Sequence, residues 1–235
     1  MRFRMPTLKR SSYEGTKQAD NILRAARRVF ARDGAASFST RRVAREAKLG
    51  LASVQHVFPT TESLLEAMVE SIVNGYAAAY RDMVPRMPLN ARIRLVGVLD
   101  YLLDDVRNPD TRSIFFGLWA FGCHSRLIAR LLDQGYAFQR DSLAGFIAAV
   151  RTDLSDDDCR MVAATVIVML DGSMIFTAPD SRVIPRNEFL LHLRQSILDL
   201  IDRAKASGVM PAVAPSVQRR RRVPRLAHSV PRGSR

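Results

Sequence analysis

Side chains suited to reading DNA bases and phosphates follow one another on a short predicted helix. The Gln55 amide can pair with both the acceptor and the donor that adenine presents in the major groove. Ser53 and His56 suit phosphate oxygens, which fix the position of a protein on the duplex rather than read its sequence. Val54 and Phe58 fall on the opposite face, where they would hold the helix against its neighbours. The pattern predicts a helix that enters a DNA major groove.

Three helices are predicted around this surface, and they form a helix-turn-helix pattern. Apolar residues recur with a 3.6-residue period over 17–33, over a second helix that Ser39 caps, and over 51–58. Gly34 suits the left-handed position at the end of the first helix. The tight turn 48–50 joins the last two helices, so the pair matches the geometry that a helix-turn-helix requires.

Small and charged residues complete this unit. Ala44, Ala47 and Gly50 are expected to let the two helices cross closely. The helix that Ser39 caps begins with free N–H groups that can bind a phosphate. Three arginines supply positive charge beside that helix start: Arg41, Arg42 and Arg45.

Four linked motifs, at residues 22–34, 39–49, 53–58 and 62–65, resemble the DNA-binding domain of TetR-family transcriptional regulators over roughly residues 17–70. The resemblance implies a homodimer that binds a palindromic operator, acts by default as a repressor and is released by a small-molecule effector. The DNA-binding residues that follow from the motifs and the resemblance are Ser39, Thr40, Arg41, Arg42, Gly50, Leu51, Ala52, Ser53, Gln55, His56, Thr60 and Thr61.

The sequence departs from the family pattern at four positions. Gln55 and Val57 replace aromatic residues of the second helix-turn-helix helix, and Thr61 replaces a lysine that binds a backbone phosphate in relatives. That phosphate contact would then move to Thr60, to Arg41 or to the basic ends of the chain. Lys48 stands where glycine is usual, which is expected to alter the turn.

The whole chain is predicted to be all-α. Further helices are expected near 61–84, 90–106, 110–122, 124–151, 155–177 and 186–205, separated by Pro, Gly, Asn and Asp clusters. The expected organisation is a basic, disordered arm (1–16), the helix-turn-helix domain (17–77), a helical effector-binding and dimerisation domain (78–207) and a basic, disordered tail (208–235).

By the same resemblance, the dimer would form through the helices near 157–177 and 186–205. The first of these is apolar nearly all round, which an intradomain core helix would also explain. The effector pocket would lie in the second domain, with these candidate residues: Tyr101, Phe115, Phe116, Trp119, His124, Tyr136, Asp171 and Phe176. For the aromatic residues, ordinary core packing is the alternative. Asp171 is either a hydrogen-bonded core residue or a pocket acid for a cationic ligand.

Positive charge gathers at the two ends of the 235 residues. The formal net charge is +13, with +9 over residues 1–60, −3 over 61–210 and +7 over 211–235. Basic ends can bind nucleic acid or a membrane surface without sequence preference, through contacts that salt weakens. A non-specific nucleic-acid-binding protein is therefore the alternative function.

Several other classes of protein are excluded or disfavoured. Two cysteines give no disulfide framework and suggest a reducing, cytoplasmic location, and no apolar run is long enough to span a membrane. No G-x-S-x-G, H-E-x-x-H or glycine-rich phosphate loop occurs, so the chain is not expected to be an enzyme. No ligand cluster indicates a metal, and no cofactor is expected.

Overall fold

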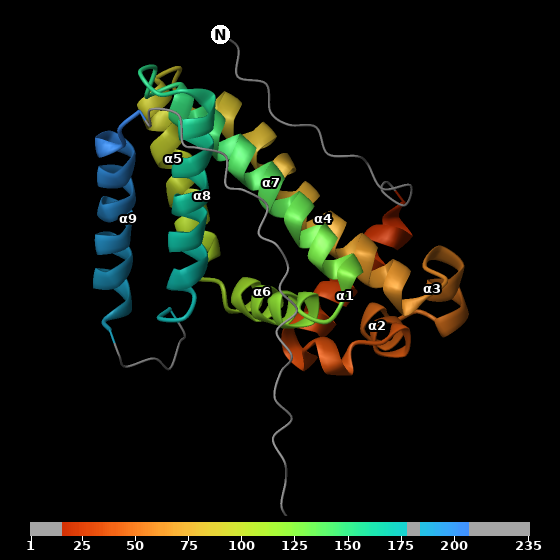
Figure 1. Cartoon of the computed structure of the whole chain (residues 1–235). Helices are drawn as coiled ribbons and strands as arrows, with labels where there is room; N and C mark the ends of the chain where they lie inside the picture. Colours follow the sequence, from red (N-terminus) through yellow and green to blue (C-terminus); the bar gives the residue numbers. More distant parts are fainter. Residues whose placement is uncertain (1–15, 178–183, 207–235) are drawn as a thin grey trace, which may run out of the picture.

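The computed structural model describes residues 16–177 and 184–206, and these hold nine α-helices and two short 3-10 turns, with no strand (Figure 1). The prediction of an all-α fold is confirmed. The predicted arm and tail lie, apart from Thr16, outside the described residues. The helices are α1 (Lys17–Asp33), α2 (Thr40–Ala47), α3 (Leu51–Val57), α4 (Thr61–Met83), α5 (Ala91–Asp105), α6 (Pro109–Gly122), α7 (Arg126–Ala148), α8 (Asp156–Ser173) and α9 (Arg186–Arg203).

Capping side chains set where the helices begin. Ser39 accepts a hydrogen bond from the backbone of α2, and Thr60 exchanges hydrogen bonds with Ser63 at the start of α4. Ser155 and Asp158 form the same reciprocal arrangement on α8, whose first turn carries three aspartates as the helix dipole favours. Most predicted helix ends are correct within two or three residues. Helix α8 ends at Ser173, earlier than predicted, because the next residues form a turn.

Two residues with positive φ shape the connections of the N-terminal helices. Gly34 has φ 73° and ψ 172°, so glycine is needed for its positive φ, but the residue is not in the left-handed helical region that was predicted. Lys48, at the end of α2, is the residue in that region, with φ 57° and ψ 43°. A residue with a side chain therefore adopts a conformation that favours glycine.

Two hydrophobic clusters build the core, and they divide the helices differently from the predicted domains. The first joins α1 to α4 with Ile114 and Leu118 of α6 and Ile128 and Leu131 of α7. The second joins the end of α4 with α5 and with α7 to α9. Helix α4 runs without a break through residue 77, the predicted domain boundary, and Figure 1 shows α4 and α7 side by side across the molecule.

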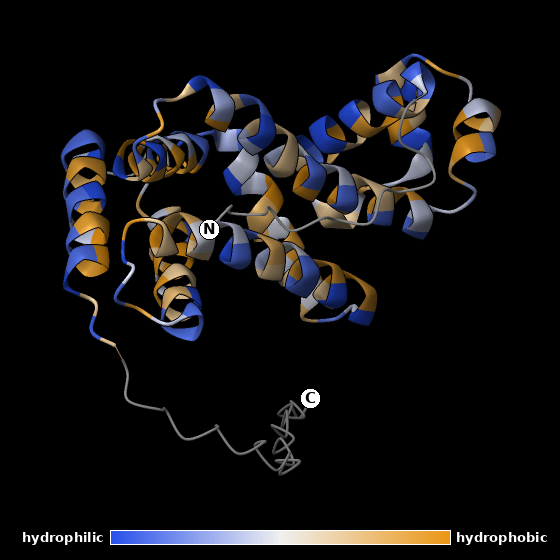
Figure 2. Ribbon diagram, turned by 90° about the horizontal axis from the view of Figure 1, so that it is seen from above, coloured by the Kyte–Doolittle hydropathy of each residue, from blue (hydrophilic) through white to orange (hydrophobic). Residues whose placement is uncertain are grey.

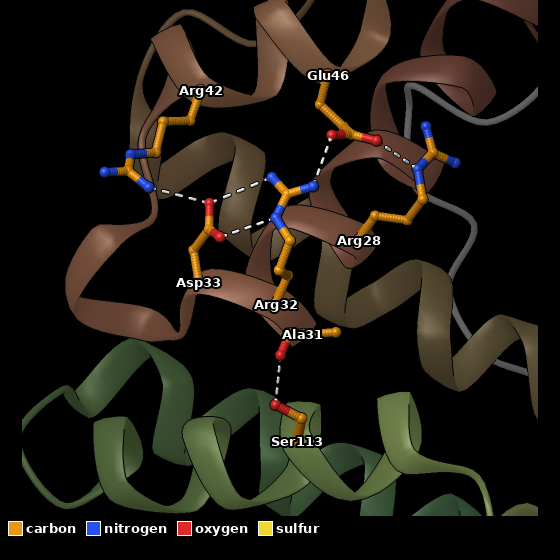
Figure 3. Close-up of polar contacts among 7 residues, drawn as sticks. All are labelled: Arg28, Ala31, Arg32, Asp33, Arg42, Glu46 and Ser113. Carbon is orange, nitrogen blue, oxygen red and sulfur yellow. Dashed lines mark hydrogen bonds and ion pairs between the residues drawn. The ribbon is translucent and has the colours of Figure 1, made fainter.

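Helix α6 packs directly against helix α1 of the helix-turn-helix unit. The Ser113 hydroxyl donates a hydrogen bond of 2.5 Å to the Ala31 carbonyl oxygen (Figure 3). One turn further on, Gly117 lies so close to the fully buried Phe30 ring that an added Cβ would come within 2.8 Å of it. The N-terminal unit is thus fixed to the rest of the molecule by close packing.

Helices α8 and α9 leave apolar side chains in solvent. Met161, Val168 and Ile175 recur at seven-residue intervals and are 62%, 69% and 62% exposed, and Leu191 of α9 is 69% exposed. Helix α9 stands at the edge of the molecule, where its ribbon shows hydrophobic and hydrophilic residues in alternation (Figure 2). No helix among the described residues is long and apolar enough to cross a membrane.

Candidate DNA interface and effector cavity

Helix α3 presents polar residues outward from a buried anchor. Val54 and Phe58 have no solvent exposure, as predicted, and they belong to the hydrophobic cluster of the N-terminal helices. Ala52, Gln55 and His56 are exposed on the other side. Leu51 and Ser53, by contrast, are half-buried. A rigidly held short helix with an exposed amide and imidazole is the arrangement that direct readout of a major groove needs.

Helix α2 supports α3 through small buried residues. Ala44 and Ala47 are buried against α1, and the Asn21 amide of α1 donates a hydrogen bond to the Ala47 carbonyl oxygen. Gly50 does not serve the close crossing for which it was predicted. A Cβ at Gly50 would meet only the Ser53 hydroxyl, at an ordinary contact distance of 3.8 Å, so a side chain would clash with nothing there.

A chain of ion pairs ties α1 to α2 (Figure 3). Glu46 accepts from the Arg28 Nε at 2.8 Å and from the Arg32 Nη1 at 3.0 Å. Asp33 accepts from the Arg32 Nε at 2.9 Å and from the Arg42 Nη1 at 3.0 Å. Arg42, one of the predicted DNA contacts, is therefore held in place from α1, while its guanidinium stays half-exposed.

The neighbouring arginines keep the carboxylates of Asp33 and Glu46 ionised. Hydrogen bonds from Arg32, and then from Arg42, hold the pKa of Asp33 below its usual value. Hydrogen bonds from Arg28 and Arg32 do the same for the pKa of Glu46. These shifts indicate that the ion pairs persist at neutral pH.

The predicted threonines lie at the junction of α2 and α4. The hydroxyls of Thr40 and Thr61 are 3.1 Å apart and share a hydrogen bond. The Thr60 hydroxyl accepts from the Ser63 N–H at 3.0 Å and so caps α4. Ser39, Arg41 and Arg45 lie nearby on α2, where both arginines are exposed. Thr61 is thus turned toward α2.

A cavity lies between helices α4 to α8. The space open to the centre of a water-sized sphere measures about 50 Å³. Aliphatic and aromatic residues line most of it. The lining residues are Val69, Ile72, Val73, Tyr76, Leu102, Asp105, Val106, Phe115, Leu118, Leu132, Gly135, Tyr136, Gln139, Ile167, Leu170, Asp171 and Met174.

The structure divides the predicted effector residues into three groups. Phe115, Tyr136 and Asp171 line the cavity. Two further residues lie beside it: Tyr101 lines a neighbouring cavity, and Trp119 hydrogen-bonds to Tyr136. Three residues lie outside, contrary to the prediction: Phe116, His124 and Phe176 are exposed to solvent. These three lie on outward faces or in turns, which the approximate helix bounds from the sequence could not distinguish from cavity positions.

Two hydrogen-bonded groups make the polar part of the cavity wall. In the first, the Trp119 Nε1 donates to the Tyr136 hydroxyl at 2.7 Å, and that hydroxyl bonds to the Asp171 carboxylate. In the second, Asp105 accepts from the Tyr76 hydroxyl at 2.5 Å and from the Thr111 hydroxyl at 3.1 Å. Each carboxylate therefore accepts a hydrogen bond from a tyrosine hydroxyl.

Burial shifts the ionisation of these groups. It raises the pKa of Asp171 to about 6, although the Tyr136 hydrogen bond opposes the shift. Burial, with the nearby Asp171, raises the pKa of Tyr136, and burial with Asp105 raises that of Tyr76. A carboxyl that titrates near neutral pH inside an apolar cavity is a feature of functional sites.

Sequence reasoning missed Tyr76, Asp105 and Gln139. Tyr76 continues the apolar helical period of α4, which favours a core position, and Asp105 falls at the end of α5 among other aspartates. Gln139 lies three residues after Tyr136, so helical spacing could have placed it on the same face. No group of three or more possible metal ligands lies within residues 16–177 and 184–206.

Comparison with known proteins agrees with this architecture. Residues 22–68 match the profile described as bacterial regulatory proteins, tetR family, and residues 91–202 match that of the BetI-type transcriptional repressor, C-terminal. With its N-terminal helix-turn-helix and these two matches, the chain is a DNA-binding transcriptional regulator. The chain belongs to the TetR family of such regulators.

Solved structures share the fold. A TetR regulator from Haloarcula marismortui is 21% identical, with a TM-score of 0.66 over 79% of this chain and 96% of that one. Salmonella enterica GusR is 22% identical, with a TM-score of 0.61 over 80% and 97%. A structure from Saccharomonospora viridis, described as a transcriptional regulator in complex with choline, is 21% identical, with a TM-score of 0.64 over 80% and 97%. None of the curated proteins compared with the chain matches it significantly.

Proposed function

We propose that this regulator is a cytoplasmic repressor that binds a palindromic operator as a homodimer and leaves it when a small molecule binds. The observation that carries the DNA-binding part is the outward presentation of Gln55 and His56 from a helix whose other face is fully buried. Gln55 would read a base, and His56 with the start of α2 would bind phosphates.

Arg42 is the best candidate for a structured phosphate contact. Its ion pair with Asp33 limits the motion of the guanidinium, so less side-chain entropy is lost when a phosphate binds. Arg41 and Arg45 lie on exposed positions of the same helix and would add charge. With Thr61 bonded to Thr40, these arginines would take over the contact that lysine makes in relatives.

The exposed apolar residues of α8 and α9 support dimerisation through these two helices. Met161 and Val168 lie two helical turns apart on α8, so they share one face, while Ile175 is exposed in the turn after α8 and Leu191 is exposed on α9. Large apolar side chains in such a row mark an interface rather than a free surface. A symmetric pair of these faces would make the expected homodimer.

The cavity supports release by an effector, because its walls lead to the DNA-binding helices. Helix α4 lines the cavity with Ile72 and Tyr76 and begins directly after α3. Helix α6 lines it with Phe115 and contacts α1 through Ser113. A ligand that moves α4 or α6 would change the separation of the two α3 helices, which must be roughly 34–36 Å for adjacent half-sites. The profile of a repressor and the choline complex of a similar structure also support this part.

Two variants test the assignment of the DNA-binding surface. The affinity of Gln55→Ala and of Arg42→Ala is measured for the DNA sites that the parent protein enriches. Gln55→Ala is expected to lose about 1–3 kcal/mol of preference at one base position in each half-site, while Arg42→Ala weakens all sequences alike. If both variants bind and discriminate like the parent, α3 and α2 are not the docking surface.

A further inference from the structure

We infer that the effector of this regulator is a small organic cation, held in the cavity between α4 and α8 by Asp105 and Asp171. The inference rests on the proposed function and adds the chemical class of the ligand. It follows from three features of the cavity: the sign of its charge, the direction of its hydrogen bonds and its size.

The cavity wall carries acidic groups and no basic ones. Asp105 and Asp171 line it, and none of the described lining residues is a lysine, arginine or histidine. Arg27 lines a neighbouring cavity together with Asp105 and Tyr76. Arg27 instead donates to the Ser71 hydroxyl at 2.9 Å and forms no ion pair within the described part of the chain. The two carboxylates are therefore left to a ligand of opposite charge.

The hydrogen bonds in the wall also disfavour an anionic ligand. Tyr76 donates its proton to Asp105, and Tyr136 bonds to Asp171 while it accepts from Trp119. Both tyrosine hydroxyls are thereby committed to the carboxylates. A carboxylate accepts several hydrogen bonds, so Asp105 and Asp171 can each accept another from an ammonium group. Apart from the Gln139 amide, which can both donate and accept, the polar wall therefore consists of acceptors.

The aromatic rings and the volume limit the ligand further. Tyr76, Phe115 and Tyr136 line the same space, and aromatic faces attract cations that have lost their water. The space open to the centre of a water-sized sphere, about 50 Å³, leaves room for a compact ligand. A compact alkylammonium ion fits this description.

The test compares ligands of one shape and different charge. The full chain is titrated with tert-butylammonium, its neutral isostere tert-butanol and the anion pivalate, and binding is followed by calorimetry. The fluorescence of the single tryptophan, Trp119, gives a second signal, because its indole bonds to a cavity residue. We expect tert-butylammonium to bind at least about tenfold more tightly than tert-butanol, and pivalate not to bind. Equal binding of cation and neutral isostere, or no binding of the cation, would overturn the inference.

Three variants assign the effect to the cavity. Asp171→Asn and Asp105→Asn keep the side-chain shape but remove a charge, and each should abolish most of the preference for the cation. Asp104→Asn is the matched control, since Asp104 lies next to Asp105 but is exposed. If the preference survives in both cavity variants, the cation binds elsewhere and the inference is wrong.

The DNA-binding measurement separates this inference from the proposed function. A protein that selects an operator but shows no preference for the cation overturns the ligand class alone. A protein that binds the cation in the cavity but selects no DNA sequence overturns the proposed function.

Discussion

Replacing Asp171 by Asn should stabilise the protein at neutral and alkaline pH. Burial raises the pKa of this carboxyl from 3.8 to about 6, so folding forces an ionised group into an apolar wall. A pKa that is higher in the folded state means that the folded protein binds the proton more strongly. The stability that the protonated Asp171 contributes is therefore fully present below the unfolded pKa and is lost as pH rises through about 6. Each pKa unit corresponds to about 1.4 kcal/mol, so the cost of ionisation reaches up to about 3 kcal/mol.

Urea denaturation followed by circular dichroism measures this cost. Parent and Asp171→Asn are compared at equal protein concentration at about pH 8 and about pH 5, because the difference between them cancels the other titrating groups. We expect the variant to gain up to about 3 kcal/mol at the higher pH and about half as much at the lower. Asp104→Asn should show no comparable gain. A variant that is no more stable than the parent at about pH 8 would contradict the desolvation of Asp171.

Three further substitutions test the turn, the α1–α6 joint and the dimer face. Lys48→Gly should raise the free energy of unfolding by about 1 kcal/mol, because a side chain is strained in the left-handed region, and Lys48→Ala should not. Gly117→Ala should lower it by about 1–3 kcal/mol through overlap with a buried ring, whereas Gly75→Ala, which meets nothing closer than 4.0 Å, should not. The free energy of unfolding of each variant and its control is measured by thermal or urea unfolding. An equal change in a variant and its control would refute the local geometry described for that position. Val168→Glu should weaken the dimer at least about 100-fold in sedimentation, and Leu89→Glu, although Leu89 is 89% exposed, should leave it intact. If neither variant dissociates the dimer, the interface lies elsewhere.

The local features of the fold could be predicted because they depend on short-range signals. Ser39, Thr60 and Ser155 cap helices where a hydroxyl precedes an apolar period, and Val54 and Phe58 follow the period into the core. These interactions involve residues three or four apart, which a single sequence contains.

Features that depend on tertiary packing could not be predicted. The cavity combines Tyr76 of α4, Asp105 of α5 and Tyr136 of α7, and no spacing along the chain brings these together. The ion pair between Asp33 and Arg42 depends on how α2 crosses α1. At Gly34 the sequence indicates that a glycine is needed. It does not indicate the ψ angle, because the turn that follows sets it.

The DNA-binding residues remain a prediction from both sequence and geometry. The outward direction of Gln55 and His56 is a fact of the fold, but the base that each would meet depends on the DNA.

Selection of bound sequences from random duplex DNA, at low and at several-fold higher salt, tests the central claim most directly. The account predicts one palindrome with two half-sites, recovered at both salt concentrations, because base contacts of the two α3 helices persist when phosphate contacts weaken. Recovery of no consensus, with binding lost at higher salt, would contradict it and would assign DNA binding to the basic ends of the chain.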